Sequence, residues 1–566
     1  MNLALKIMEN AELYPGIEVS TVPIRSYPSL EGENAAHVLG YVGSVTDEQL
    51  NDPSQNYYRN ENVGKTGLEI EYDKYLRGIP GIKTLIVNRK ESVTKQDQNS
   101  QAVAGNNLIT NIDAKLQAAT EKALANAIRR AKANGYRGDS GGAVVLDVKT
   151  GQVLAMASYP TYDPSIWQRG LTVQQAEDLF SEKTGIPALS RPLQGLFAPA
   201  STFKSISVVA AASAGYGLDA TYNCPASVDI GNRTFKNFDS IAAGRITLEQ
   251  AIAISCDSLW YQIAYNEWVR DGGLKPNAKP NDYFFTAARE FGIGKKTGID
   301  LPSELGGRNP DRQWKQDWYD QNKDYFCNYK DRADKSQLTA YLIGIARENC
   351  IDGNKVRAGD AVNFSIGQGD LLVTPLKLAQ IYAGIANNGV MYQPQVARAI
   401  VDPNGKVLSE FKPVKAGTVA AKPAVWNFLH TALRAVVTRG TAAGSFAGFP
   451  VAVSGKTGTA QVQGKNPNGS AKDDTSWFAS FAPSNDPQYA VVMMVSQGGF
   501  GASTSGVGVR EIYEALFGVV GNKVDPTKAI FPNGVPTNIP AVNMKLAATA
   551  KLDTSGLKIN GTKVVK

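Results

Sequence analysis

The chain has 566 residues, of which 43% are hydrophobic and 20% are charged, so it can form a large core and roughly two to four globular domains. Its net charge of +7 is spread along the sequence, which argues against nucleic-acid binding, because such sites gather lysine and arginine in one patch. The two isolated histidines, His37 and His430, and four scattered cysteines predict no metal site, and no apolar run has the ~18–20 residues of a membrane span.

Residues 1–108 alternate short strand-like runs with turns. They begin without the long apolar centre of a signal peptide, and they contain no recognisable catalytic motif. The pattern predicts strands at 19–24, 37–42 and 84–88, a helical stretch at 67–76, and a linker or long hairpin tip at 90–107. We therefore expect a strand-rich N-terminal domain that carries no chemistry of its own.

Residues 109–520 combine a helical centre with strands at both ends. A helix is predicted after Asp113, with apolar residues at helical spacing as far as about Lys132. Further on, the pattern predicts a hairpin of strands 142–147 and 152–157, mainly helices over 165–440, strands at 451–460, 477–482 and 489–496, and a helix at 509–519. Early and late strands then belong to one antiparallel sheet flanked by helices, an α+β fold. Residues 521–566, which are rich in proline, are expected to form a tail of low order.

The stretch that suggests chemistry starts at Ser201. Pro199 ends the preceding segment, and a run of small apolar residues follows, so Ser201 is expected at the N-terminus of a buried helix. Lys204 is one turn further along the same face. A serine hydroxyl is a poor nucleophile until a base takes its proton, and a buried lysine that stays neutral can act as that base.

Two further motifs follow in order along the chain. Ser255 and Asp257 are predicted on one helix over about 247–268. The Lys-Thr-Gly triplet occurs five times, but only the copy at Lys456 follows alternating valines and is extended by Thr459, as in a strand edge. Small residues such as Gly458 would let a peptide substrate lie close to that strand.

The cysteines allow two interpretations. Cys327 and Cys350 lie in or beside one polar insertion, so they are the more plausible disulfide pair if the compartment is oxidising. Cys224 and Cys256 are expected to be buried free thiols.

The order Ser-x-x-Lys, Ser-x-Asp, Lys-Thr-Gly resembles the class B penicillin-binding proteins, most of all the elongation-type penicillin-binding protein 2 lineage. The resemblance extends over about residues 15–520. It is carried by the three motifs and by the stretches Arg25–Pro28, His37–Gly43, Gly67–Glu69, Leu76–Gly78, Thr110–Asp113, Phe291–Gly294, Thr297–Pro302, Gly367–Gly369 and Thr374–Pro375.

The resemblance implies a penicillin-binding transpeptidase domain over 109–520, with 1–108 as a pedestal or dimerisation-type domain that is truncated at its start. It implies a peptidoglycan D,D-transpeptidase without a cofactor, in which Ser201 attacks the penultimate D-alanine of a stem peptide. Lys204 would be its base, and Ser255 and Lys456 would pass a proton to the departing D-alanine. The backbone amides of Ser201 and Thr459 would bind the oxyanion.

Substrate and partners are also implied by the resemblance. The terminal carboxylate of the D-Ala-D-Ala stem peptide would lie near Lys456, Thr457 and Thr459, next to Gly458, and β-lactams would acylate the same serine. The protein would act on the extracytoplasmic face of the bacterial membrane, with its anchor segment missing from this chain. Membrane-embedded cell-wall synthesis proteins would bind the N-terminal domain.

Two positions depart from the common family pattern. Asp257 stands where many relatives have asparagine, and an ionised carboxylate beside Lys204 would favour the charged lysine unless Lys456 takes up that charge. Ala200 stands where glycine is common, so we expect the turn before Ser201 to avoid a conformation that glycine alone adopts readily.

Two other functions share these motifs. A β-lactamase or D,D-carboxypeptidase would use the same three motifs, but the N-terminal region and the long tail argue against it. A catalytically silent β-lactam sensor or scaffold is the other alternative, and the presence of Ser201, Lys204 and Lys456 argues against silence.

Overall fold

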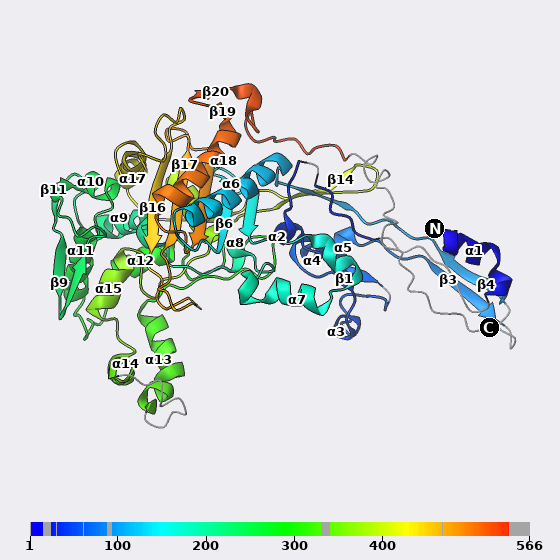
Figure 1. Ribbon diagram of the computed structural model, residues 1–566, viewed down its shortest axis with the longest axis horizontal. Coiled ribbons are helices and arrows are strands. Elements are labelled where there is room, and N and C mark those ends of the chain that lie inside the picture. Colours follow the sequence, from blue (N-terminus) through cyan, green and yellow to red (C-terminus); the bar gives the residue numbers. More distant parts are fainter. Residues whose placement is uncertain are drawn as a thin grey trace.

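A five-stranded antiparallel sheet forms the centre of the larger domain (Figure 1). In the computed structural model, residues 2–14, 24–29, 31–59, 61–87, 93–329, 340–466 and 468–542 are described. The strand order is β16-β17-β18-β6-β7, so both ends of the domain contribute, as predicted. The strands are β6 (Ser140–Asp147), β7 (Val153–Tyr159), β16 (Ser454–Ala460), β17 (Thr475–Ala482) and β18 (Tyr489–Ser496). Because β16 is an edge strand of this sheet, one side of it is free to face other parts of the molecule.

Helices cover both faces of the sheet. The neighbouring glycines Gly141 and Gly142 on β6 face opposite sides, because side-chain positions alternate along a strand. Gly141 lies against Leu124 of α6 (Ala114–Ala133), and Gly142 lies against Pro192 of α8. Helix α18 packs on α6, and α16 packs on α8 and on the other face of β6 and β18. The remaining bounds are α8 (Arg191–Gln194), α16 (Pro375–Ala386) and α18 (Val507–Phe517).

The predicted helix after Asp113 is confirmed, and its start has a clear physical cause. The Asp113 carboxylate accepts a hydrogen bond from the Leu116 backbone N–H at 2.9 Å, which satisfies one of the free N–H groups of the first turn. Leu116, Leu124 and Ile128 recur at helical spacing, and all are buried. The helix therefore follows from local sequence alone.

The three sequence motifs lie between the sheet and a second, mainly helical lobe. The elements that carry them or hold them in place are η4 (Ala200–Phe203), α9 (Lys204–Ser213), β8 (Thr221–Cys224), β9 (Ser227–Ile230), β10 (Arg233–Lys236), β11 (Gly244–Thr247), α10 (Leu248–Ala253) and α11 (Ser258–Arg270). Other helices of this lobe are α12 (Tyr283–Glu290), α13 (Arg312–Cys327), α14 (Ala340–Asp352), α15 (Ala358–Ser365) and α17 (Pro423–Thr438). Helices α13 and α14 project from the lobe (Figure 1). The predicted Cys327–Cys350 disulfide joins these two helices and is confirmed.

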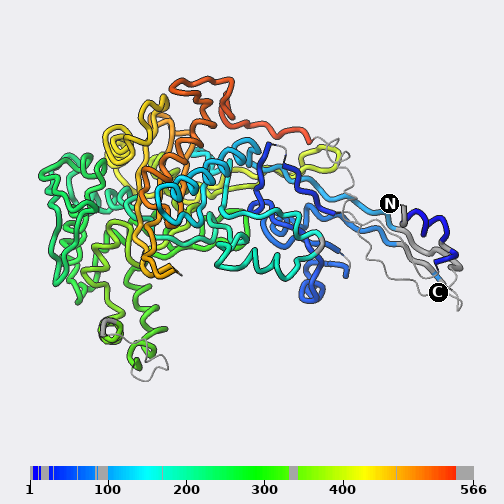
Figure 2. The backbone as a smooth tube through the Cα atoms, in the orientation of Figure 1, coloured from blue at the N-terminus to red at the C-terminus, as the bar shows by residue number. Residues whose placement is uncertain are grey.

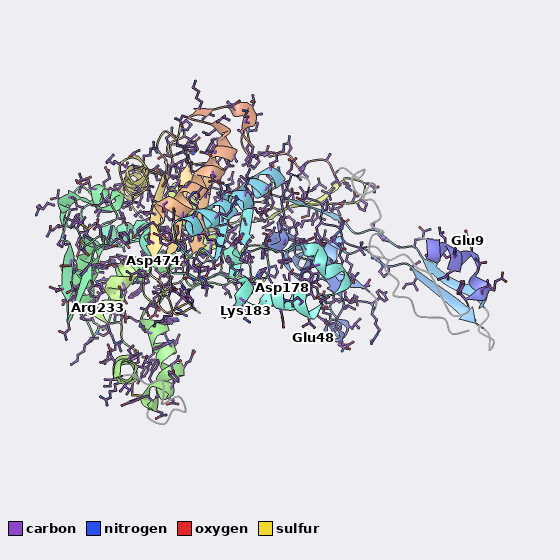
Figure 3. All side chains as sticks on the ribbon, in the orientation of Figure 1. Glu9, Glu48, Asp178, Lys183, Arg233 and Asp474 are labelled. Atoms are coloured by element: carbon purple, nitrogen blue, oxygen red, sulfur yellow. A yellow bond between two sulfur atoms is a disulfide. The ribbon has the colours of Figure 1, made fainter. Side chains whose placement is uncertain are left out.

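The N-terminal region extends away from the sheet (Figures 1 and 2). Its described elements are α1 (Asn2–Glu9), α2 (Ala36–Leu39), β1 (Val42–Ser44), α3 (Asp47–Leu50), β2 (Asn62–Gly64), α4 (Gly67–Glu71), α5 (Asp73–Leu76), β3 (Ile82–Val87) and β4 (Val93–Ser100). Strands β3 and β4 form a long hairpin with α1 beside it, so residues 93–100 of the predicted linker or hairpin tip are a strand of that hairpin. Figure 3 places Glu9 at this end of the molecule and Arg233 at the other.

Two strand predictions in this region fail or lie outside the structure. The strand at 37–42 is wrong, since Ala36–Leu39 is a helical turn. His37 there is turned into the protein, where its Nε2 meets the Pro187 carbonyl at 2.7 Å, a tertiary contact that periodicity does not encode. The predicted strand at 19–24 lies outside the described residues except for Ile24.

Polar contacts join the two regions. Tyr72 donates to Asp300 at 2.7 Å, and the Asn34 backbone N–H donates to Glu121 at 2.9 Å. Strand β5 (Asn107–Thr110) pairs with β13 (Ala397–Val401) and so crosses the expected boundary at 108.

At the C-terminal end of the described residues, Phe531 stacks on Tyr489, with 6.2 Å between ring centroids, so part of the predicted tail packs on the sheet domain. Among the described helices, none is long and apolar enough to cross a membrane.

Candidate active site

Ser201 lies in a tight turn that leads directly into α9, as predicted. The backbone N–H of Ala200 donates to the Gly367 carbonyl at 2.8 Å. On the sheet side, Trp477 donates its indole N–H to the Ala198 carbonyl at 3.0 Å. Distant segments therefore hold the backbone on both sides of the serine, whose side chain remains partly exposed.

The turn has a strained residue immediately before the serine. Ala200 has a φ of 49°, in the left-handed region that glycine adopts without steric cost. The expectation that alanine would avoid such a conformation is therefore wrong. A Cβ at Gly367 would lie 2.2 Å from the Ala200 carbonyl oxygen, so the two backbones are packed closely enough to enforce it. Strain of this kind, about 1–3 kcal/mol per residue, persists only where the surroundings fix the backbone.

Lys204 is fully buried, and its three ammonium protons have three partners. The Nζ donates to Asp257 Oδ1 at 2.6 Å, to the Ser255 carbonyl at 2.7 Å and to Ser255 Oγ at 3.1 Å. The structure thus brings the first and second motifs together. Among the described residues, no hydrogen bond joins the Ser201 hydroxyl to Lys204.

The second motif is not on a single helix, and this part of the prediction is wrong. The chain breaks between α10 and α11, and Ser255, Cys256 and Asp257 form the break. Ser255 has a φ of 61°, and the Cys256 N–H bonds back to the Ala251 carbonyl at 2.9 Å. This is the geometry that usually ends a helix at a glycine. The apolar pattern continues through the break, so it cannot reveal it.

Lys456 lies on the edge strand β16 and is also fully buried. Among the described residues, its Nζ donates hydrogen bonds only to Thr457, at 3.2 Å from the carbonyl and 3.5 Å from the hydroxyl, and to no carboxylate. Thr457 in turn shares a 2.6 Å hydrogen bond with Thr441. The Thr459 hydroxyl accepts the Gly501 N–H at 3.2 Å, which fixes the far end of the strand.

The two buried lysines influence each other. Burial lowers the pKa of Lys204, and the neighbouring Asp257 opposes that effect. Burial, together with the positive charge of Lys204, lowers the pKa of Lys456 well below its usual range, while Asp257 raises it. The Asp257 carboxylate therefore acts on both lysines. A single negative charge beside two lysines favours one ammonium and one neutral amine.

Strand β16 packs directly against the serine turn. A Cβ at Gly458 would lie 2.9 Å from the Pro199 carbonyl oxygen and 3.0 Å from Thr202 Cγ2. Only glycine allows this close approach of the strand to the turn that carries Ser201. The small residues of this strand were expected to make room for a peptide substrate. They also make room for the serine turn.

Cys224 and Cys256 form a disulfide, so the prediction of free thiols for this pair is wrong. The two cysteines are 32 residues apart in sequence, and β8 and β11 bring them together. An even cysteine count together with an implied extracytoplasmic location was the sequence signal for a second bridge. Sequence reasoning also missed Asn237, whose side chain contacts the motif break.

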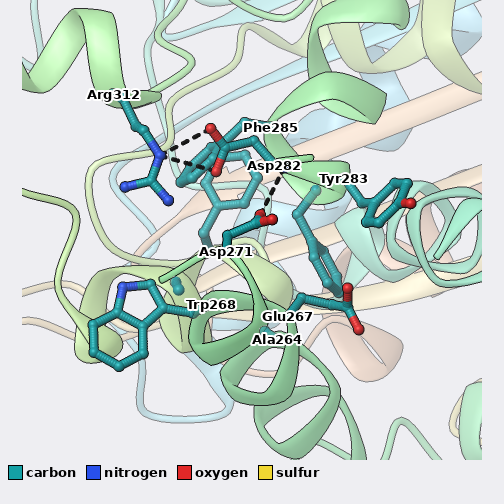
Figure 4. Close-up of a pocket in the computed structure, with 11 residues that line it drawn as sticks. Ala264, Glu267, Trp268, Asp271, Asp282, Tyr283, Phe285 and Arg312 are labelled. Carbon is teal, nitrogen blue, oxygen red and sulfur yellow. Dashed lines mark hydrogen bonds and ion pairs between the residues drawn. The ribbon is translucent and has the colours of Figure 1, made fainter. Parts of the chain in front are cut away.

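A separate cavity of about 30 Å³ lies under α11 and α12 (Figure 4). Figure 4 shows Arg312 paired with Asp282, and Asp271 accepting from the Asp282 backbone N–H at 2.8 Å. None of the predicted catalytic residues lines it. These contacts hold the 271–282 connection and the base of α13. Within the described residues, no group of three or more histidine, cysteine or acidic side chains could hold a metal ion.

Sequence comparisons agree with the geometry. Residues 141–516 match the family described as penicillin binding protein transpeptidase domain, and residues 2–110 match the penicillin-binding protein dimerisation domain. The peptidoglycan D,D-transpeptidase MrdA of Haemophilus influenzae is 29% identical over 531 residues, covering 89% of this chain and 71% of that protein. The Escherichia coli K12 protein of the same name is 28% identical, covering 90% of this chain and 73% of its own length.

Solved structures share the fold. Pseudomonas aeruginosa PBP2, in complex with WCK 5153, has a TM-score of 0.66 and 27% identity, covering 89% of this chain and 92% of that chain. A chain from a study of polymerization and crosslinking by a peptidoglycan synthase complex has a TM-score of 0.67 and 28% identity, covering 87% of this chain and 76% of that one. The family match spans well over half of the chain and includes all three motifs. The chain therefore belongs to the penicillin-binding protein transpeptidase family, in the class B lineage that includes penicillin-binding protein 2.

Proposed function

We propose that Ser201 is the nucleophile through which this D,D-transpeptidase crosslinks peptidoglycan stem peptides. The observation that carries the proposal is the convergence of Lys204, Ser255 and Asp257 in one hydrogen-bonded cluster, with Lys456 on the strand that packs against the serine turn. A nucleophile, a candidate base and a proton relay are thereby assembled in one place.

Acylation needs a neutral Lys204, so the Lys204 ammonium first gives up one proton and the neutral Lys456 amine takes one up. The terminal carboxylate of the stem peptide binds next to Lys456 and favours the charged form of that lysine. The new positive charge lowers the pKa of nearby Lys204, because the two ammonium groups repel each other. Lys204 then takes the proton of Ser201 while Oγ forms a bond to the carbonyl carbon of the penultimate D-alanine.

The oxyanion that forms is bound by the backbone N–H groups of Ser201 and Thr459, and the close packing of Gly458 against the serine turn supports this placement. When the C–N bond breaks, the departing D-alanine amine receives a proton through Ser255, whose Oγ is 3.1 Å from Lys204 Nζ. An amine of a second stem peptide then attacks the ester. Its lost proton returns through the same groups to Ser201 Oγ, and the new amide is the crosslink.

The substrate peptide lies along the free edge of β16. An edge strand offers backbone groups that an extended peptide can pair with, and the Thr457 and Thr459 hydroxyls line the end nearest Lys456. A β-lactam presents its carboxylate and ring carbonyl in the same arrangement. It acylates Ser201 but carries no separate leaving group that makes room for the acceptor amine.

The direct test is a reaction with a D-Ala-D-Ala pentapeptide donor and an amine acceptor peptide. The proposal expects release of D-alanine together with a crosslinked dimer, both lost in Ser201→Ala. Release of D-alanine with tetrapeptide alone would indicate a D,D-carboxypeptidase, and steady consumption of penicillin would indicate a β-lactamase. No acylation by either reagent would favour the sensor or scaffold.

Replacing Asp257 with asparagine is expected to move the acid limb of the pH profile for acylation to lower pH. Asp257 raises the pKa of both Lys204 and Lys456, so without its charge both lysines lose their protons more readily. The rate of acylation by a chromogenic cephalosporin, followed from acid to neutral pH, measures the shift. Asp486→Asn, at an exposed position between β17 and β18, is the matched control. An unchanged or raised midpoint for Asp257→Asn would contradict the proposed role of Lys204.

We also propose that residues 1–108 form a pedestal for assembly with membrane-embedded cell-wall synthesis proteins on the extracytoplasmic face of the membrane. The dimerisation-domain match at 2–110 supports a separate unit, and a relative with 28% identity comes from a peptidoglycan synthase complex. The long β3–β4 hairpin and α1 lie far from the five-stranded sheet against which the Ser201 turn packs (Figure 1), so partners there would leave the active site open.

A further inference from the structure

The start of α11 has an unusual cap. Asp257 occupies the N-cap position, where aspartate normally accepts hydrogen bonds from the first backbone N–H groups of its own helix. Here the Asp257 side chain makes no such bond, and its Oδ1 instead accepts from Lys204 at 2.6 Å. The first N–H groups of α11 therefore need an acceptor from elsewhere.

Asn237, in the connection between β10 and β11, provides that acceptor. Its Oδ1 accepts the backbone N–H of Asp257 at 3.0 Å and that of Ser258 at 2.9 Å. Its Nδ2 donates to the carbonyls of Pro225 at 2.8 Å and Ile241 at 3.0 Å. Asn237 is 8% exposed, and both protons and both lone pairs of its amide are used, so its orientation is fixed.

The Cys224–Cys256 disulfide anchors the same break at Cys256, which is its middle residue. Cys224 ends β8, which is paired with β11, and Cys256 stands between Ser255 and Asp257. Ser258 adds a third link, because its hydroxyl donates to the Pro225 carbonyl at 2.7 Å. A small sheet, rather than a flexible loop, thus holds the backbone of the second motif.

We propose that Asn237 and the Cys224–Cys256 disulfide are positioning elements of the active site, which cap α11 in place of Asp257 and so leave the Asp257 carboxylate free to bind Lys204. This inference rests on the proposed function. It explains how one aspartate can begin a helix and yet give its charge to a catalytic lysine. It also explains why the left-handed Ser255 stays in place, since the residues on its C-terminal side are anchored.

The inference predicts a specific result for Asn237→Ala. Without the Asn237 oxygen, the N–H groups of α11 compete with Lys204 for the Asp257 carboxylate, so the acid limb of acylation moves to lower pH, as in Asp257→Asn. Acylation also slows about 10- to 100-fold, which is the scale of misplacing a catalytic group by about 1 Å. A merely structural role would lower the melting temperature but leave the pH midpoint unchanged.

Two comparisons make the test decisive. Asn237→Asp keeps an acceptor oxygen and must not move the limb to lower pH. In the Asn237→Ala/Asp257→Asn double variant, the Asp257→Asn change must add no further shift of the pH midpoint. The carboxylate that it removes no longer binds Lys204 once Asn237 is replaced. The groups that could also titrate here are Lys204 on α9, Lys456 on β16 and Tyr261 on α11, whose pKa is raised by burial and by Asp257.

The disulfide is tested with matched pairs of serine substitutions. Cys224→Ser/Cys256→Ser should slow acylation at least about 10-fold. Cys327→Ser/Cys350→Ser, in the projecting α13–α14 arm, should leave the acylation rate within about twofold of the parent rate. Equal rates for the first pair and the parent, or additive pH shifts in the double variant above, would overturn the inference. A parent that is not acylated at Ser201 would instead overturn the proposed function.

Discussion

Lys204→Met should reduce the rate of Ser201 acylation by a labelled penicillin about 10³-fold, within the range that a positioned proton acceptor contributes. Methionine matches the length and apolar stem of lysine, so it fits the buried site but cannot take the serine proton. The second-order rate constant for acylation, measured by fluorescent penicillin labelling over time, reports the loss.

The same change leaves the Asp257 carboxylate without its ammonium partner, which is destabilising by about 3–5 kcal/mol for a buried pair. The control is therefore the double variant Lys204→Met/Asp257→Asn, in which no charge is stranded. Its melting temperature should recover toward that of the parent while acylation stays low. If either folded variant were acylated within tenfold of the parent, about 1.4 kcal/mol of barrier, Lys204 would not be the base.

Gly458→Ala is the second change with a large expected effect. The added Cβ would lie 2.9 Å from the Pro199 carbonyl oxygen, closer than real contacts of this kind, so β16 and the serine turn must move apart. The Ser201 and Thr459 amides would then no longer fit one oxyanion, a loss of about 10²-fold in acylation when one donor is misplaced.

Gly417→Ala on β15 (Lys415–Thr418) is the matched control, because a Cβ there meets nothing within 4 Å. It should leave acylation unchanged. For Gly458→Ala, the melting temperature separates a local shift from global unfolding. Acylation at the parent's rate in a folded Gly458→Ala protein would show that the close approach of strand and turn is not needed.

Local sequence was sufficient to predict the elements whose causes are local. Asp113 and the apolar spacing after it define α6, and the turn at Lys149 defines the β6–β7 hairpin. The sheet that combines early and late strands followed from their arrangement around a helical centre. Ser201, Lys204 and Lys456 were identified from motif order and context, and the structure brings their segments together.

The remaining features depend on contacts between distant residues. The break at Ser255 needs a left-handed residue inside an apolar helical pattern, and the residues that follow it are anchored by contacts to Cys224 and Asn237, which are distant in sequence. The left-handed Ala200 depends in the same way on Gly367. No pattern of hydrophobic residues in one sequence encodes such pairings.

The central claim, that Ser201 forms a covalent acyl-enzyme, is tested most directly by the mass of the intact protein after incubation with a penicillin. The parent should gain the mass of one penicillin in a stable adduct, and Ser201→Ala should gain none. An adduct that persists in Ser201→Ala, or a folded parent that forms no adduct, would contradict the account.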